Sequence, residues 1–296
     1  MIGMTKKSVK FKMEINKRLN KAAEWWGVKQ KVGVIFVENY YAITDYGVTP
    51  YLMEKDKAPV CVFTDAWKNM GEAEKWYFCY HEVGHIKYFY DGYPVPVLEA
   101  DEVNYPQIFN VVRVFPEQVL SKYSEVAVPL YKDMCERHMD HLITYTLASA
   151  FKPEMHEAIR WMLQKPVKNK NNFLIPPTYL AFLLVVDYAC YRNYYELADL
   201  SDKEIEGQIL KGVLKLEKDL PNAKEVFERA KGIISEVRFS TDINTITKWI
   251  LEMYSLMPEI DFKAHNGRVS QILKEGLKKS NLQDLSWSYS QKSSGS

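Results

Sequence analysis

The chain has 296 residues, of which 47% are hydrophobic and 26% are charged; this composition is typical of a folded globular protein and excludes a disordered one. Its formal net charge of +1 gives no electrostatic reason to expect binding to nucleic acid or to an anionic membrane. At about 150 residues per domain, the length favours roughly two domains.

The N-terminal part has the pattern of a small α+β unit. Residues 8–26 place apolar side chains on one face of a helix, and Gly27 then supplies a stop signal. The side chains on that face are Phe11, Ile15, Leu19, Ala22 and Trp26. Short β-branched runs predict strands over 31–37 and 59–67, and the stretch 40–53 predicts a hairpin or an irregular strand.

The rest of the chain is dominated by helical periodicity. A helix is predicted over 71–90, because Asp91 and Gly92 form a turn signal there and two prolines follow. Further helices are predicted over 96–105, 107–124, 129–150, 153–164, 177–198, 202–218, 221–237, 241–256 and 266–278. We therefore expect a small α+β unit over 1–125, an all-helical domain over 126–285 and a flexible tail over 286–296.

The sequence favours a cytoplasmic protein that does not enter a membrane. Residues 1–13 lack the apolar stretch of a secretory signal. The most apolar run, residues 179–190, is interrupted by Asp187 and is too short to span a bilayer. The four cysteines form no CxxC pair, so we expect them to be buried thiols in a reducing compartment.

The predicted helix over 71–90 contains the pattern His-Glu-x-x-His. On a helix, residues four apart project from the same side of successive turns, so His81 and His85 can both reach one Zn²⁺ ion. Glu82 lies about 100° round the axis from His81, beside such an ion, where a carboxylate can accept and return a proton. The alternative interpretation is two histidines packed among tyrosines with satisfied hydrogen bonds.

This order of helix, short mixed sheet and HExxH helix resembles the zincin metallopeptidases over residues 8–105. The resemblance implies a zincin-like unit over 1–125 that holds Zn²⁺ and hydrolyses a peptide or protein substrate. Glu82 would activate a metal-bound water for this reaction. The strand at 59–64 would line the cleft and bind the peptide by edge pairing.

Zincin families differ in the third metal ligand. The metzincin-like pattern has Gly three residues after the second His, and His or Asp six residues after it. Asp91 stands at that sixth position, but Tyr88 stands at the glycine position, and Asp91 also fits a simple turn.

The gluzincin-like pattern places the third ligand on a following helix. The segment VPVLEADEVNYP, residues 95–106, resembles the Glu-x-x-Ala-Asp of compact gluzincins, which include the repressor-cleaving metallopeptidases of mobile elements. Val97 stands where that motif has its ligand, so we expect Glu99 as the third ligand, with Asp101 and Glu102 as substitutes. These acids also fit an exposed first turn of a helix.

Two further patterns leave alternatives open. Asn110 resembles the first residue of the Asn-x-x-Glu-Asp helix in metallopeptidases that accompany von Willebrand-type domains, but the acids of that motif are missing here. The pair His138 and His141, with Glu136 and Asp140 nearby, could supply a ligand or a transition-state donor, although a polar helix face is the commoner explanation.

The leading hypothesis is therefore a zinc metallopeptidase with His81, His85 and Glu99 as ligands and Glu82 as the catalytic residue. No other cofactor is expected. The alternative is a zincin-like protein that has lost catalysis and acts as a binding or structural module. A third possibility is a metal site that only joins the two domains.

Overall fold

The structure of the protein is a computed structural model. It describes residues 6–37, 48–51, 59–93, 126–151, 153–154, 156–158, 175–197, 202–237, 240–268 and 271.

The chain begins with the long helix α1 (Lys6–Trp26), which confirms the helix predicted over 8–26. Ile15, Leu19 and Ala22 are buried on one face, as their spacing of three to four residues predicts. The helix ends at Gly27, whose φ of 68° lies in the left-handed region that favours glycine. Helix α1 packs against α2 and β1.

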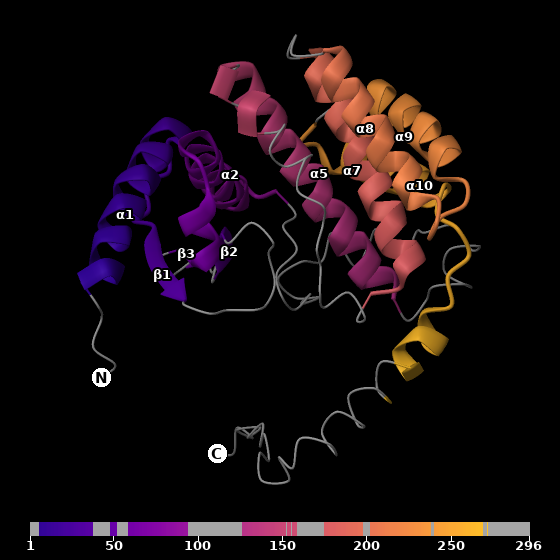
Figure 1. Ribbon diagram of the computed structural model, residues 1–296, viewed down its shortest axis with the longest axis horizontal. Coiled ribbons are helices and arrows are strands. Elements are labelled where there is room, and N and C mark those ends of the chain that lie inside the picture. The colour runs from indigo at the N-terminus through magenta and orange to yellow at the C-terminus, as the bar shows by residue number, and fades with distance from the viewer. Residues whose placement is uncertain are drawn as a thin grey trace.

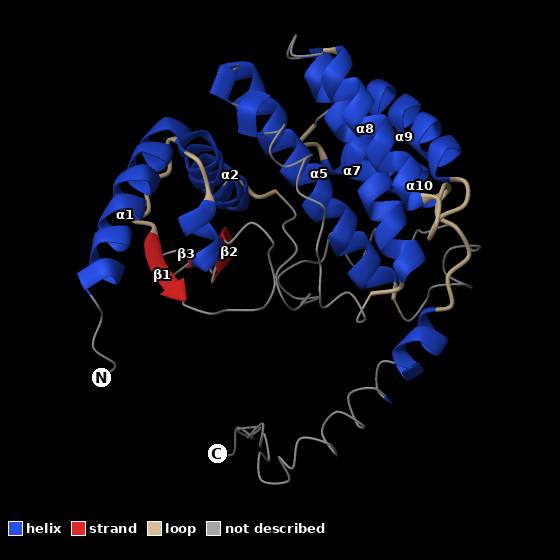
Figure 2. Cartoon of the chain, viewed as in Figure 1, coloured by secondary structure: helices blue, strands red, loops and turns tan. Residues whose placement is uncertain are grey.

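Three short strands form a mixed sheet in the order β1-β3-β2 (Figure 2). Strand β3 (Val60–Thr64) is central: it pairs in parallel with β1 (Gly33–Val37) and antiparallel with β2 (Val48–Tyr51). Both sides of β3 are therefore occupied, and the expectation that the strand at 59–64 binds a peptide by edge pairing is wrong. The order of strands along the chain does not fix their order in the sheet. Here β2 pairs with the free side of β3, which makes β3 the central strand.

Helix α2 (Glu72–Tyr90) follows β3 through the short 3₁₀ helix η1 (Asp65–Asn69) and confirms the helix predicted over 71–90. The later helices also match their predictions closely: α5 (Ala127–Ala150), α7 (Pro177–Leu197), α8 (Lys203–Leu216), α9 (Ala223–Val237) and α10 (Ile243–Tyr254). The helices predicted over 96–105 and 107–124 lie outside the described residues.

Helix α5 occupies the centre of the molecule (Figure 1). It packs against α2 on one side and against α7 and α10 on the other, while α7 also contacts α8 and α9. The coarse prediction of an α+β fold is confirmed, because a small sheet in the N-terminal part is followed by helices. The division at residue 125 falls in a range that the structure does not describe, as does the tail over 286–296, so both remain predictions.

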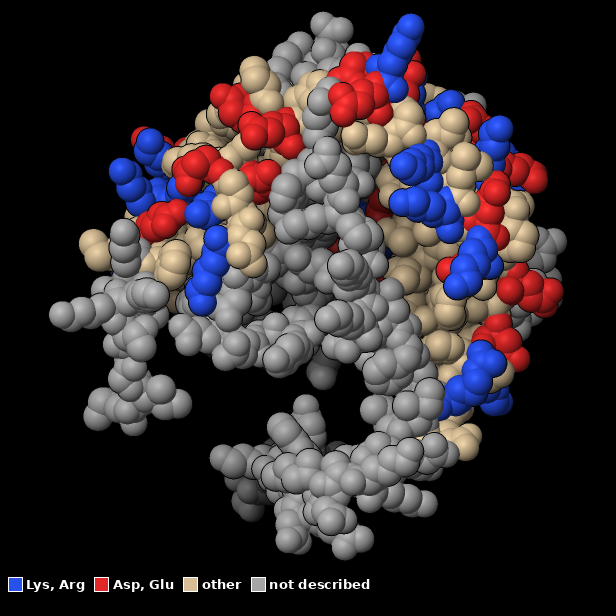
Figure 3. Space-filling view, viewed as in Figure 1, with Lys and Arg blue, Asp and Glu red and all other residues tan. Residues whose placement is uncertain are grey.

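Lys and Arg side chains are interspersed with Asp and Glu over the described part of the face shown in Figure 3. This mixture agrees with the net charge of +1. None of the described helices is both long enough and apolar enough to cross a membrane.

Candidate metal centre

Helix α2 carries the two motif histidines on its buried side. Its first turn contains Glu72 and Glu74, which favour the positive end of the helix dipole, and its last turn contains Lys87. His81 and His85 lie within the helix, away from both of its ends, and are 9% and 6% exposed. The regular helix therefore places both imidazoles on one side, as the sequence predicts.

Gly84 lets α5 approach α2 at the level of the two histidines. A Cβ atom at this position would lie 2.8 Å from Cγ2 of Ile143 on α5 and 3.1 Å from the Trp26 ring. Any side chain larger than hydrogen would therefore force the side chains of Ile143 or Trp26 to move. The close approach brings Asp140, which precedes Ile143 by three residues on the same helix face, up to the histidines.

Replacing Gly84 by alanine should lower the free energy of unfolding. Overpacking against Ile143 destabilises by about 1–3 kcal/mol, against a helix-propensity gain of up to about 1 kcal/mol. Denaturant unfolding followed by circular dichroism measures the difference. The control is Gly207→Ala on α8, where the added Cβ meets no atom within 4 Å and a small gain is expected. A Gly84→Ala protein as stable as the parent would contradict the close packing.

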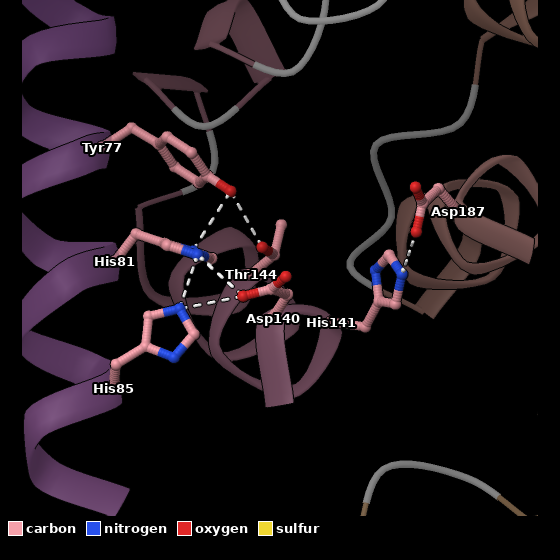
Figure 4. Close-up of polar contacts among 7 residues, drawn as sticks. All are labelled: Tyr77, His81, His85, Asp140, His141, Thr144 and Asp187. Atoms are coloured by element: carbon pink, nitrogen blue, oxygen red, sulfur yellow. Dashed lines mark hydrogen bonds and ion pairs between the residues drawn. The ribbon is translucent and has the colours of Figure 1, made fainter. Parts of the chain in front are cut away.

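One atom from each of three side chains, His81, His85 and Asp140, converges between α2 and α5 (Figure 4). Nε2 of His85 lies 2.8 Å from Oδ1 of Asp140 and 3.2 Å from Nε2 of His81. Nε2 of His81 lies 3.3 Å from the same Oδ1 atom. Among the described residues, this is the group of His, Cys, Asp and Glu side chains whose donor atoms are close enough to hold a metal ion.

The separations of these three atoms fit a small tetrahedral ion. Ligand atoms that each lie about 2.0–2.1 Å from a zinc ion are roughly 3.3–3.4 Å apart. The distances of 3.2 and 3.3 Å are close to that value, and the 2.8 Å contact is a shorter, hydrogen-bond length. Two imidazoles and one carboxylate are also a donor set that zinc accepts, and three protein ligands leave a fourth position for water or substrate.

The charges of the three groups are strongly linked. Burial would raise the pKa of Asp140, but hydrogen bonds from His81 and His85 outweigh burial and hold it well below its usual range. Burial would likewise lower the pKa of His85, yet the bond to Asp140 and the negative charge of that group raise it to about 9. For His81 burial dominates, and its pKa is lowered. Without a metal, His85 is thus the positive partner of Asp140, while His81 stays neutral.

Glu82 is a buried carboxyl group beside the cluster. It is 5% exposed, and its Oε2 atom has no hydrogen-bond partner among the residues that the structure describes. Burial raises its pKa to about 8, although the nearby charge of His85 lowers it. Its own charge raises the pKa of Cys61 on β3, so the carboxyl group lies close to the sheet as well. A carboxyl group that titrates near neutral pH is suited to accepting and returning a proton.

None of the third metal ligands predicted from the sequence is seen in the cluster of described residues. Asp91 lies at the end of α2, where its side chain is 49% exposed and forms an ion pair of 2.8 Å with Lys87. It is outside the cluster, because the turn at the helix end directs it to solvent. Glu99, Asp101 and Glu102 fall in the range 94–125, outside the described residues, so their role as ligands stays a prediction.

Asp140 was not among the ligands that the sequence predicts. It was visible only as an acid near the His138 and His141 pair, and those two histidines diverge from the cluster. His138 is buried against Trp249 and bonds to the hydroxyl of Tyr93, with 2.5 Å between Nδ1 and the oxygen.

His141 points the other way from α5, toward α7. Its Nε2 atom lies 3.2 Å from Oδ1 of Asp187 (Figure 4). Asp187 also forms an ion pair with Arg137. The two histidines thus have different partners, Tyr93 and Trp249 for His138 and Asp187 for His141, and neither supplies a donor atom to the cluster.

Comparison of the chain with protein-family models, with curated proteins and with solved structures finds no match. The functional assignment therefore depends on the chemistry and geometry of the site.

Proposed function

We propose that the protein is a zinc-dependent metallopeptidase of the zincin type. The observation that supports the proposal is the meeting of His81 Nε2, His85 Nε2 and Asp140 Oδ1 at 2.8–3.3 Å from one another, next to a buried carboxyl group. His81, His85 and Asp140 would hold the ion. When bound, zinc would polarise the scissile carbonyl of the substrate and lower the pKa of water.

The chain's own residues would divide the remaining work. Glu82 would take a proton from the attacking water in its ionised form, which a neighbouring cation would favour, and would give that proton to the leaving amine. Asp140 would also define the open side of the site, because its side chain is 38% exposed whereas those of His81 and His85 are 11% and 8% exposed. A peptide would approach from this side, since the histidines are covered.

The test is metal content and metal-dependent hydrolysis of the purified chain. We expect one zinc per chain by mass spectrometry and hydrolysis of an unfolded protein such as casein. Dialysis against a strong chelator should abolish hydrolysis, and stoichiometric zinc should restore it. A protein that binds no zinc, or whose hydrolysis survives chelation, would refute the proposal.

A second candidate is a structural metal or polar staple without catalysis. The observation that favours it is that both histidines on α2 contact Asp140 on α5, so the cluster connects the two helices even without a metal. Removal of zinc would then lower the melting temperature, and no peptidase activity would be found with zinc present. A zincin-like protein that only binds a partner would also show no hydrolysis in this assay. It would still bind that partner after the substitution Glu82→Gln.

A further inference from the structure

A row of three side chains on α5 leads from the interior of the protein past the cluster to solvent. Thr144, Asp140 and Glu136 are spaced four residues apart, so they lie on successive turns along one side of the helix. Thr144 is 2% exposed, the side chain of Asp140 is 38% exposed, and Glu136 is exposed. The site therefore opens toward Glu136, and a molecule that reaches the cluster from this side meets that carboxyl group.

Glu136 lies close enough to the cluster for their charges to interact. Although Glu136 is open to solvent, the protein atoms around it and the charge of Asp140 raise its pKa to about 7, while the positive charge of His85 lowers it. The charge of Glu136 in turn acts on His85 and on Glu82, and it raises the pKa of both. Three carboxyl groups, those of Glu82, Asp140 and Glu136, thus lie near His85.

Glu136 has no positive partner of its own in the part of the chain that the structure describes. No hydrogen bond or ion pair within that part involves its carboxyl group. Its neighbour Arg137 pairs instead with Asp187 on α7, with 3.2 Å between Nε and Oδ1. An accessible carboxylate that lies beside a second carboxylate and has no positive partner is stabilised when a positive group of a ligand binds next to it.

We propose that Glu136 is a specificity-determining residue that binds a positively charged group of the peptide substrate, either an ammonium or a guanidinium group. The inference rests on the proposed function and names the class of peptide that the site takes, with Lys, Arg or a free amino terminus close to the scissile bond. Asp140 and Glu136 have Cβ atoms about 5–6 Å apart, and an extended peptide spans about 3.3–3.6 Å per residue. The positive group therefore lies within about three residues of the scissile bond.

Mapping of the cleavage sites in casein by mass spectrometry tests this specificity. Lys, Arg or a free amino terminus should be enriched within about three residues of the bonds that the parent cleaves. Glu136→Gln keeps the shape of the side chain but removes its charge, so the enrichment should be lost. Acetylation of the amino termini distinguishes a terminal ammonium group from a lysine side chain.

Two quenched peptides that differ only in lysine or uncharged norleucine at the enriched position measure the size of the effect. The ratio of their kcat/KM values, lysine over norleucine, should fall about 5-fold in Glu136→Gln, the upper end for an ion pair that stays accessible to water. Glu136→Lys should favour a peptide with glutamate at that position. The matched control is Glu225→Gln, an exposed glutamate on α9, which packs against α7, α8 and α10; it should keep the ratio of the parent.

Peptide binding separates this inference from the proposed function. Fluorescence anisotropy of the labelled lysine and norleucine peptides on the Glu82→Gln protein requires no hydrolysis. Tighter binding of the lysine peptide that is lost when Glu136→Gln is added supports the inference even if the parent hydrolyses nothing, a result that would refute the proposed function alone. Hydrolysis without a preference for positive groups, or a preference that Glu136→Gln retains, would overturn the inference. A parent that neither binds nor cleaves the lysine peptide would overturn it as well.

Discussion

Replacing Asp140 by alanine should reduce zinc affinity by more than about 100-fold. Loss of a residue that only hydrogen-bonds to a metal ligand typically weakens metal binding 10–100-fold, and loss of the ligand itself should weaken it more. Asp140 supplies the only oxygen among the three converging donor atoms in the described part of the chain. Its loss would leave two imidazoles, which cannot complete the three-ligand set of a catalytic zinc site. Competition with a chelator of known affinity measures the change.

The controls are the other acids that the sequence offers. Asp91→Ala should leave zinc affinity unchanged, because Asp91 is an exposed partner of Lys87. Glu99→Gln tests the ligand predicted from the sequence directly. If Glu99→Gln loses zinc while Asp140→Ala keeps it, the ligand set proposed from the structure is wrong and the gluzincin-like prediction is right.

Replacing Glu82 by glutamine should lower kcat about 10²–10⁴-fold, the range for loss of a general acid–base group, while zinc content stays at one per chain. Glutamine keeps the shape of the side chain but cannot take up a proton. Because burial raises the pKa of Glu82 to about 8, the carboxyl group is largely neutral at pH 7 in the metal-free protein, and its neutral isostere should fold equally well. Initial rates on a quenched peptide, with melting temperature recorded in parallel, test this.

Glu74→Gln is the matched control for that experiment. Glu74 is also a buried glutamate on α2, 6% exposed, and its Oε2 atom likewise lacks a hydrogen-bond partner in the described part of the chain. It precedes Glu82 by eight residues and lies outside the cluster. Its substitution should leave kcat unchanged. Full activity in Glu82→Gln would exclude this glutamate as the catalytic base, and equal losses in both variants would point to a general effect on the helix.

The sequence alone determined the local features of the site. The spacing of apolar residues identified α1 and its buried face, and the turn signals at Gly27 and Gly92 identified where two helices end. The pattern HExxH placed His81 and His85 on one side of α2, because a regular helix has a fixed rotation per residue. Each of these features depends on residues within a few turns of one another.

Tertiary structure decided what the rest of the site contains. Asp140 follows His85 by 55 residues, and it reaches the histidines because α5 packs against α2 where Gly84 leaves room. The spacing of residues along the chain does not show which helices pack together. The sequence analysis therefore favoured acids closer to the histidines in the sequence, Glu99, Asp101 and Glu102. The same reason explains β3, whose central position follows from pairing with β2 and not from its place in the chain. Local spacing is set by backbone geometry, whereas contacts between distant elements are set by how side chains fit together.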